Sequence, residues 1–108
     1  MKIVYKIDAA EYLINLIDIL FEKEYFQSIK SSAIYVSKIR KEIDKTIHLR
    51  QKYNTPTELK KHGMYYKKIT INKGTTWVVY FNFIKDTYYI NFISNNHSRD
   101  AKFIEGLK

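Results

Sequence analysis

The side chains best suited to proton transfer and anion binding lie near the end of the chain, in the polar segment of residues 95–100, Asn-Asn-His-Ser-Arg-Asp. His97 is its central group, because imidazole both accepts and donates a proton readily near neutral pH. Arg99 adds a cation, and Asn95 and Asn96 add amides that can orient a bound base by hydrogen bonds. Asn, Ser and Asp also favour turns through local hydrogen bonds, so a structural turn is the alternative interpretation.

A second candidate is the stretch Tyr65-Tyr66-Lys67-Lys68, two rings followed by two cations. Lysines contact phosphate and aromatic rings stack on bases, so this stretch can contact a polynucleotide. Alternation along a strand sends Lys67 and Lys68 to opposite faces, and at most one of them then points into any one groove. A lysine that keeps an edge strand from aggregating explains the same pattern equally well.

The sequence lacks the residues that a metal site or a glycine-rich phosphate loop would need. The chain has no cysteine, and His48, His62 and His97 are far apart in the sequence, without the spacing of a zinc motif. Three glycines in the whole chain leave no glycine-rich phosphate loop. The sequence therefore predicts neither a metal site nor another cofactor.

Three consecutive antiparallel strands are expected to position both candidates. Turns are predicted at Asn72-Lys73-Gly74 and at Lys85-Asp86-Thr87, where residues that tolerate tight loops separate runs of β-branched and aromatic residues. The middle run is apolar on both faces, which is typical of a central strand. Its apolar residues are Trp77, Val78, Val79, Tyr80, Phe81, Phe83 and Ile84.

The first half of the chain predicts a strand over residues 2–7 and two helices. Asp8 and Glu11 have the spacing of a capping box, so the first helix should run over residues 9–23. The second should start near residue 26 or 28 and end at Tyr53, before the break at Pro56. Residues 57–63 form a connector, and a short helix over residues 100–106 is expected at the end, capped by Ser98 or Asp100.

These elements predict one α+β domain over residues 1–108, in the order β-α-α-β-β-β. A helical hairpin should pack on one face of an antiparallel sheet of about four strands, which the first strand joins. The apolar positions of the two helices should meet the sheet. Four side chains are expected to be buried there: Ile17, Leu20, Val36 and Ile43.

Charge favours an anionic partner. Nineteen Lys and Arg against eleven Asp and Glu give a formal charge of +8, and 16% of the residues are aromatic. The second helix is strongly basic on one face, for which a solvated surface is the commoner explanation. The early charges and the lack of a long apolar run predict no signal peptide and no membrane span, and we expect a cytoplasmic protein.

The order of elements resembles the RelE/ParE family of bacterial toxins, the toxic halves of type II toxin-antitoxin modules. The likeness covers nearly the whole chain and includes residues 63–69, Gly-Met-Tyr-Tyr-Lys-Lys-Ile, residues 77–81, Trp-Val-Val-Tyr-Phe, and the strand that ends in Asn95-Asn96-His97. The resemblance implies a cognate antitoxin, which we expect to be acidic where it touches this protein. It also implies messenger RNA, on or near the ribosome, as the target.

In members of that family that cleave messenger RNA, basic residues on the sheet and a Tyr or His near the end of the last strand serve the reaction. The resemblance therefore implies that His97 transfers a proton while Lys67 or Lys68, with Arg99, stabilises the phosphate. Tyr66 and Trp77 would stack a base, and Asn95 or Asn96 would orient it. Several of those ribonucleases have an arginine at the position of Trp77.

Two alternatives stay open. Other members of the family poison DNA gyrase and need no hydrolytic site. Outside the family, a basic domain without catalytic activity that binds an acidic protein or RNA has the same composition. A neighbouring gene for a small acidic protein would favour the toxin interpretations, and RNA cleavage would separate a nuclease from a gyrase poison.

Overall fold

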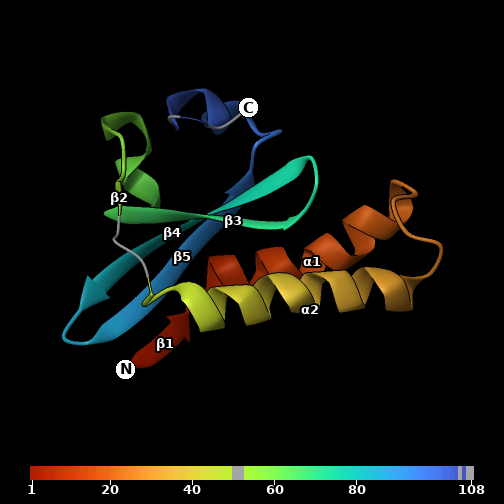
Figure 1. The fold of residues 1–108 in the computed structure, drawn as a ribbon, viewed down its shortest axis with the longest axis horizontal. Helices are drawn as coiled ribbons and strands as arrows, with labels where there is room; N and C mark the ends of the chain where they lie inside the picture. Colours follow the sequence, from red (N-terminus) through yellow and green to blue (C-terminus); the bar gives the residue numbers. More distant parts are fainter. Residues whose placement is uncertain (50–52, 105, 107–108) are drawn as a thin grey trace.

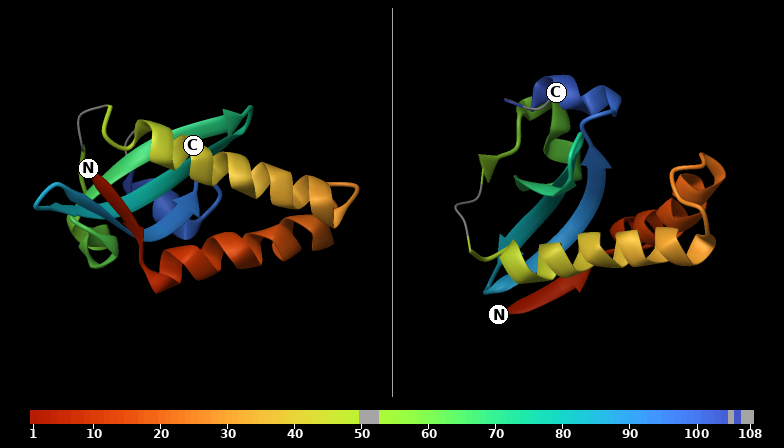
Figure 2. Two further views of the ribbon diagram at one scale, coloured as in Figure 1. Left: turned by 90° about the horizontal axis from the view of Figure 1, so that it is seen from below. Right: turned by 45° about the vertical axis from the view of Figure 1, so that its right-hand side comes forward.

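The computed structural model describes residues 1–49, 53–104 and 106. Two helices lie on one face of a five-stranded sheet, and two short 3-10 helices lie on the other (Figures 1 and 2). In chain order the elements are β1 (Lys2–Tyr5), α1 (Ile7–Glu22), α2 (Ile29–Thr46), β2 (Tyr53–Asn54), η1 (Thr57–His62), β3 (Tyr65–Asn72), β4 (Thr75–Ile84), β5 (Thr87–Asn95) and η2 (Arg99–Phe103).

The sheet has the order β1-β5-β4-β3-β2. The predicted α+β class and the antiparallel β3–β5 meander are confirmed, and β1 joins the sheet as expected. The sheet differs from the predicted antiparallel one of about four strands in two respects. β1 runs parallel to β5, pairing Ile3 with Tyr88, and the two-residue β2 adds a fifth strand where Tyr53 pairs with Tyr66.

The first helix begins earlier than the capping-box pattern predicts. α1 starts at Ile7, and no side chain caps its first turn, so the assignment of Asp8 as a cap is wrong. The chain passes straight from strand to helix at Lys6, whose N–H donates to Ile90 O at 2.9 Å while its carbonyl accepts from Ala10 N at 2.9 Å. Asp8 instead lies in the first turn, where the helix dipole favours an acidic residue.

The other element ends also differ in part. Ser28 caps α2 by accepting from Ser31 N at 3.1 Å, near the predicted start. The helix ends at Thr46, earlier than predicted, and Tyr53, the predicted last residue, lies in β2. The predicted terminal helix is the 3-10 helix η2, which follows Ser98 without a side-chain cap.

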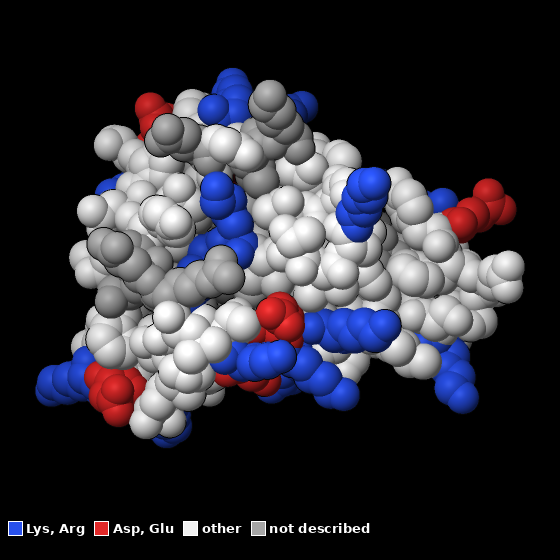
Figure 3. Space-filling view, viewed as in Figure 1, with Lys and Arg blue, Asp and Glu red and all other residues white. Residues whose placement is uncertain are grey.

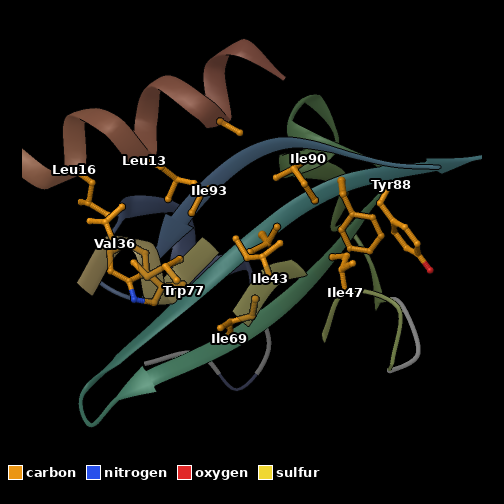
Figure 4. Close-up of a cluster of buried hydrophobic side chains, with 14 residues drawn as sticks. Leu13, Leu16, Val36, Ile43, Ile47, Ile69, Trp77, Tyr88, Ile90 and Ile93 are labelled. Carbon is orange, nitrogen blue, oxygen red and sulfur yellow. The ribbon is translucent and has the colours of Figure 1, made fainter. Parts of the chain in front are cut away.

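The main core lies between the α1–α2 hairpin and the sheet (Figure 4). Val36 and Ile43 are buried there as predicted, whereas Ile17 and Leu20 are only half-buried against the same cluster. The residues labelled in Figure 4 show how both helices contribute to it: Leu13, Leu16, Val36, Ile43, Ile47, Ile69, Trp77, Tyr88, Ile90 and Ile93.

A smaller core covers the opposite face of the sheet. Val78 and Tyr80 of β4 pack there against Leu59 of η1 and Ile104, which follows η2. β4 is therefore buried on both faces, as its two apolar faces predict. The two 3-10 helices, η1 and η2, contact each other over this smaller core and form a second layer on the sheet.

Gly63, at the junction of η1 and β3, is expected to tolerate no side chain. Its φ is +152°, and a Cβ there would lie 2.9 Å from the backbone nitrogen of Phe81. Gly63→Ala should lower the free energy of unfolding by about 1–3 kcal/mol, measured by urea denaturation. Gly74→Ala is the matched variant, since φ is +90° there but no atom lies within 4 Å. Equal losses in the two variants would contradict the close approach at Gly63.

Candidate functional site

The candidate site residues predicted from the sequence lie on both faces of the sheet. Trp77 lies on the face that packs on the helices, and Val78 lies on the opposite face. Lys67 pairs with Val79 and Lys68 pairs with Val78, so the two lysines lie on opposite faces, as alternation predicts. Only Lys68 lies on the face that η1 and η2 cover.

Lys67 is part of the scaffold. Its side chain is buried, and Nζ donates to the carbonyl oxygen of Thr46, the last residue of α2. A cation is favourable at that end of a helix, because the last carbonyls are unpaired and the dipole is negative there. This contact fastens α2 to β3.

Replacing Lys67 by Ala should therefore destabilise the protein by about 2 kcal/mol, through loss of a charged hydrogen bond to a helix end. Lys68→Ala, one residue along the same strand and exposed, should change stability by less than about 0.5 kcal/mol. Urea denaturation of both variants measures the difference. A smaller loss for Lys67 than for Lys68 would show that the helix contact contributes little.

Three predicted site residues meet in an aromatic groove of about 590 Å³ between the tip of the helical hairpin and the sheet. They are Trp77, Asn95 and His97. The other residues that line the groove are Tyr12, Leu16, Ile19, Leu20, Lys23, Tyr25, Phe26, Tyr35, Asn72 and Thr75. Lys23 is the one lysine in this lining, so the groove suits apolar groups better than a polyanion.

Hydrogen bonds fix the floor of the aromatic groove. Trp77 is only 2% exposed, and its Nε1 donates to the Tyr35 hydroxyl at 3.2 Å, which in turn donates to Asn72 Oδ1. Burial raises the pKa of Tyr12 to about 12, as expected for a phenol in apolar surroundings. A base cannot stack on Trp77 without opening the core.

The polar segment of residues 95–100 is mostly a turn that joins β5 to η2. Asn96 Oδ1 accepts from Thr76 N at 3.1 Å, and Asn96 Nδ2 donates to Gly74 O at 3.2 Å. Asn95 Oδ1 accepts from the backbone N–H of His97 at 2.8 Å. His97 itself is exposed.

The last residue of that segment, Asp100, has a partner far away in the sequence. Asp100 Oδ2 lies 3.3 Å from Nε2 of His62, at the end of η1. The Asp100 side chain is 32% exposed and the His62 side chain is 15% exposed, so both are partly accessible to solvent. The His62 ring is stacked on Phe92 at 4.0 Å between centroids, which fixes its orientation.

Tyr80 lies beside His62. Its ring centroid is 5.2 Å from that of His62. Burial raises the pKa of Tyr80, the Ser94 hydroxyl lowers it in part, and the nearby charge of Asp100 raises it further. The phenol of Tyr80 therefore stays neutral near neutral pH.

His62 also lines a polar hollow of about 430 Å³ at the edge of the second layer. Two lysines, an imidazole, two amides and a carboxylate surround this space. The lining residues are Lys6, Ile7, Asp8, Lys61, His62, Asn82, Asn91 and Phe92. An imidazole oriented by a carboxylate, beside cations in an open hollow, is an arrangement suited to proton transfer at a phosphate.

No protein-family model, curated protein or solved structure matches this chain. Among the described residues, no group of three His, Asp or Glu side chains is placed to hold a metal ion. No helix in the described ranges is long and apolar enough to cross a membrane.

One face of the sheet thus carries most of the polar side chains that could take part in a reaction. Lys68, Tyr66 and η2, which begins at Arg99, lie on the face of Tyr80 and the His62–Asp100 pair. His97, Asn95 and Trp77 line the aromatic groove on the helix side. The sequence gives no direct signal for the His62–Asp100 pair, because the two residues are separated by 38 positions.

Proposed function

We propose that this chain is the toxin of a bacterial type II toxin-antitoxin module of the RelE/ParE kind. In this proposal it acts in the cytoplasm and cleaves messenger RNA during translation without a metal ion. The order of elements and the charge of +8 support the proposal. The observation that carries it is the His62–Asp100 pair, whose imidazole lines the polar hollow.

The proposed reaction uses the ribose 2′-hydroxyl as nucleophile. His62 takes the proton of that hydroxyl, and the 2′-oxygen forms a bond to the adjacent phosphorus. The bond from phosphorus to the 5′-oxygen breaks, and the 5′-oxygen takes a proton from solvent. The products are a 2′,3′-cyclic phosphate and a 5′-hydroxyl. Asp100 does not touch the substrate and is a positioning residue that orients the imidazole.

His62 is favoured over His97 by its surroundings. The resemblance gives the proton-transfer role to His97, which lies in an exposed turn beside a groove of aromatic side chains. His62 has a carboxylate at 3.3 Å and lines a hollow with Lys6 and Lys61. Lys68 and Arg99, both exposed, would contact more distant phosphates of the same strand.

Inhibition of DNA gyrase without RNA cleavage is the second candidate function. It is favoured by the separation of His97 from Lys68, because a toxin that needs no hydrolytic site does not require these residues to meet. An interaction domain without catalytic activity is consistent with the same separation. Both alternatives leave the His62–Asp100 pair with a structural role only, between η1 and η2.

The proposed partner is a small antitoxin that is acidic where it meets this protein. Figure 3 shows Lys and Arg side chains along the edge where α2 lies, with some Asp and Glu between them. Opposite charge on the partner would speed association and make it sensitive to salt. Co-expression with the adjacent open reading frame should restore growth and yield a co-purified complex. Recovery of this chain alone, with toxicity unchanged, would argue against the antitoxin.

Induction in a heterologous bacterium, followed by primer extension on transcripts and a plasmid supercoiling assay, tests the function. We expect arrested growth, new 5′ ends within translated messages and normal supercoiling. Intact transcripts with relaxed or broken DNA would support the gyrase alternative. Normal growth with neither change would remove both toxin proposals.

A further inference from the structure

We propose that the polar hollow binds the ribose-phosphate backbone of single-stranded RNA, with one phosphate between Lys6 and Lys61 and a ribose hydroxyl at Asn91. This inference rests on the proposed function, since it names the subsite in which that reaction would hold its substrate. The two lysines come from different elements, Lys6 from the residue before α1 and Lys61 from η1.

The amides on the floor of the hollow differ in what they offer a ligand. Asn82 Oδ1 already accepts from Met64 N at 2.9 Å. Asn91 Oδ1 is buried, and no donor among the described residues reaches it. A buried carbonyl oxygen without a donor is unfavourable, so a ligand that donates a hydrogen bond to it would stabilise the hollow. The 2′-hydroxyl of a ribose next to the reacting one is such a donor, and DNA lacks it. The reacting 2′-hydroxyl itself gives its proton to His62.

Charge around the hollow fits one bridging phosphate. Lys6 and Lys61 contribute two positive charges and Asp8 one negative charge, and all three side chains are exposed. No side chain caps the first turn of α1, which begins at this rim, so its positive end also favours an anion. The carboxylate of Asp8 lowers the net positive charge of the lining to about one, which favours one bound phosphate over two.

The amide of Asn91 lies close to the backbone turn at Gly63. Its Nδ2 lies 3.3 Å from the position that a Cβ on Gly63 would occupy, and His62 directly precedes this glycine. The same turn therefore places the imidazole and leaves room for the amide. A ribose hydroxyl at Asn91 would consequently lie in the hollow that His62 lines.

The test is fluorescence anisotropy with a labelled 12-nucleotide RNA and the DNA of the same sequence, using the His62→Gln protein so that the RNA stays intact. Adding Lys61→Glu should raise the Kd for RNA roughly 5- to 20-fold and lower the salt slope by about 1. Lys60→Glu is the matched variant, because Lys60 is exposed in η1 but does not line the hollow. It should change the Kd by less than about 2-fold. Asn91→Leu should abolish the preference for RNA over DNA.

Equal effects of the two lysine variants would overturn the inference, because binding would then follow the general positive field. A retained RNA preference in Asn91→Leu, with the fold checked by circular dichroism, would overturn the role of the amide. Cleavage by the wild-type protein with either of these outcomes would leave the proposed function standing. Binding as predicted, with transcripts left intact by the wild type, would support the subsite and remove the nuclease.

Discussion

Replacing His62 by Gln is expected to lower the rate of messenger RNA cleavage by about 10²-fold or more while the protein stays folded. Glutamine keeps a polar side chain of similar length but cannot take a proton from the ribose hydroxyl. The imidazole is the group that Asp100 orients at 3.3 Å and that faces the polar hollow. Primer extension on a defined transcript, with the amount of protein matched between samples, measures the rate.

His97→Gln is the matched variant, because His97 is exposed and lies in the turn at the aromatic groove. It should change the cleavage rate less than about 3-fold, since it removes no group near the hollow. The reverse result, with cleavage lost in His97→Gln and kept in His62→Gln, would return the proton-transfer role to the polar segment. Thermal unfolding of both variants separates loss of chemistry from loss of fold.

Trp77→Ala should cost about 3–5 kcal/mol of the free energy of unfolding, measured by urea denaturation. Trp77 is 2% exposed, packs between α2 and the sheet, and donates from Nε1 to the Tyr35 hydroxyl at 3.2 Å. Removing it leaves a cavity and takes one hydrogen bond from the Tyr35 hydroxyl. The structure therefore places Trp77 in the core. The resemblance, in contrast, implies that Trp77 stacks a base.

Ile84→Ala on the same strand provides the comparison, because Ile84 is 52% exposed. It should cost less than about 1 kcal/mol, with little cavity left behind. If Trp77→Ala were as stable as Ile84→Ala but failed to bind RNA, the base-stacking role would be correct. That outcome would also require the aromatic groove to open for its ligand.

Much of the fold could be predicted because local patterns agree with the final packing. The apolar residues on both faces of β4 and the turn residues before Thr75 and Thr87 define the meander before any contact is known. The parallel pairing of β1 with β5 could not be predicted, because both orientations bury the same alternating residues. The place of Tyr53 in β2, and not in the predicted helix, follows from its pairing with Tyr66, which no local pattern shows.

The site was harder to predict, because its residues meet only after folding. Lys67 looks like a phosphate ligand in the sequence, but the structure uses its charge at the end of α2. Asp100 looks like one member of a polar turn, yet its partner His62 lies at the end of a 3-10 helix, 38 positions away. A lone histidine in a connector gives no pattern that distinguishes a functional role from a structural one.

The most direct test of the central claim is the chemistry of the RNA ends made by the purified protein on ribosomes translating a defined message. A 2′-hydroxyl nucleophile predicts a 2′,3′-cyclic phosphate on the upstream fragment and a 5′-hydroxyl on the downstream one. These ends should appear with wild type and with His97→Gln, and fall by about 10²-fold with His62→Gln. A message that stays intact, or ends that depend on His97 and not on His62, would contradict the assignment of this hollow as the active site.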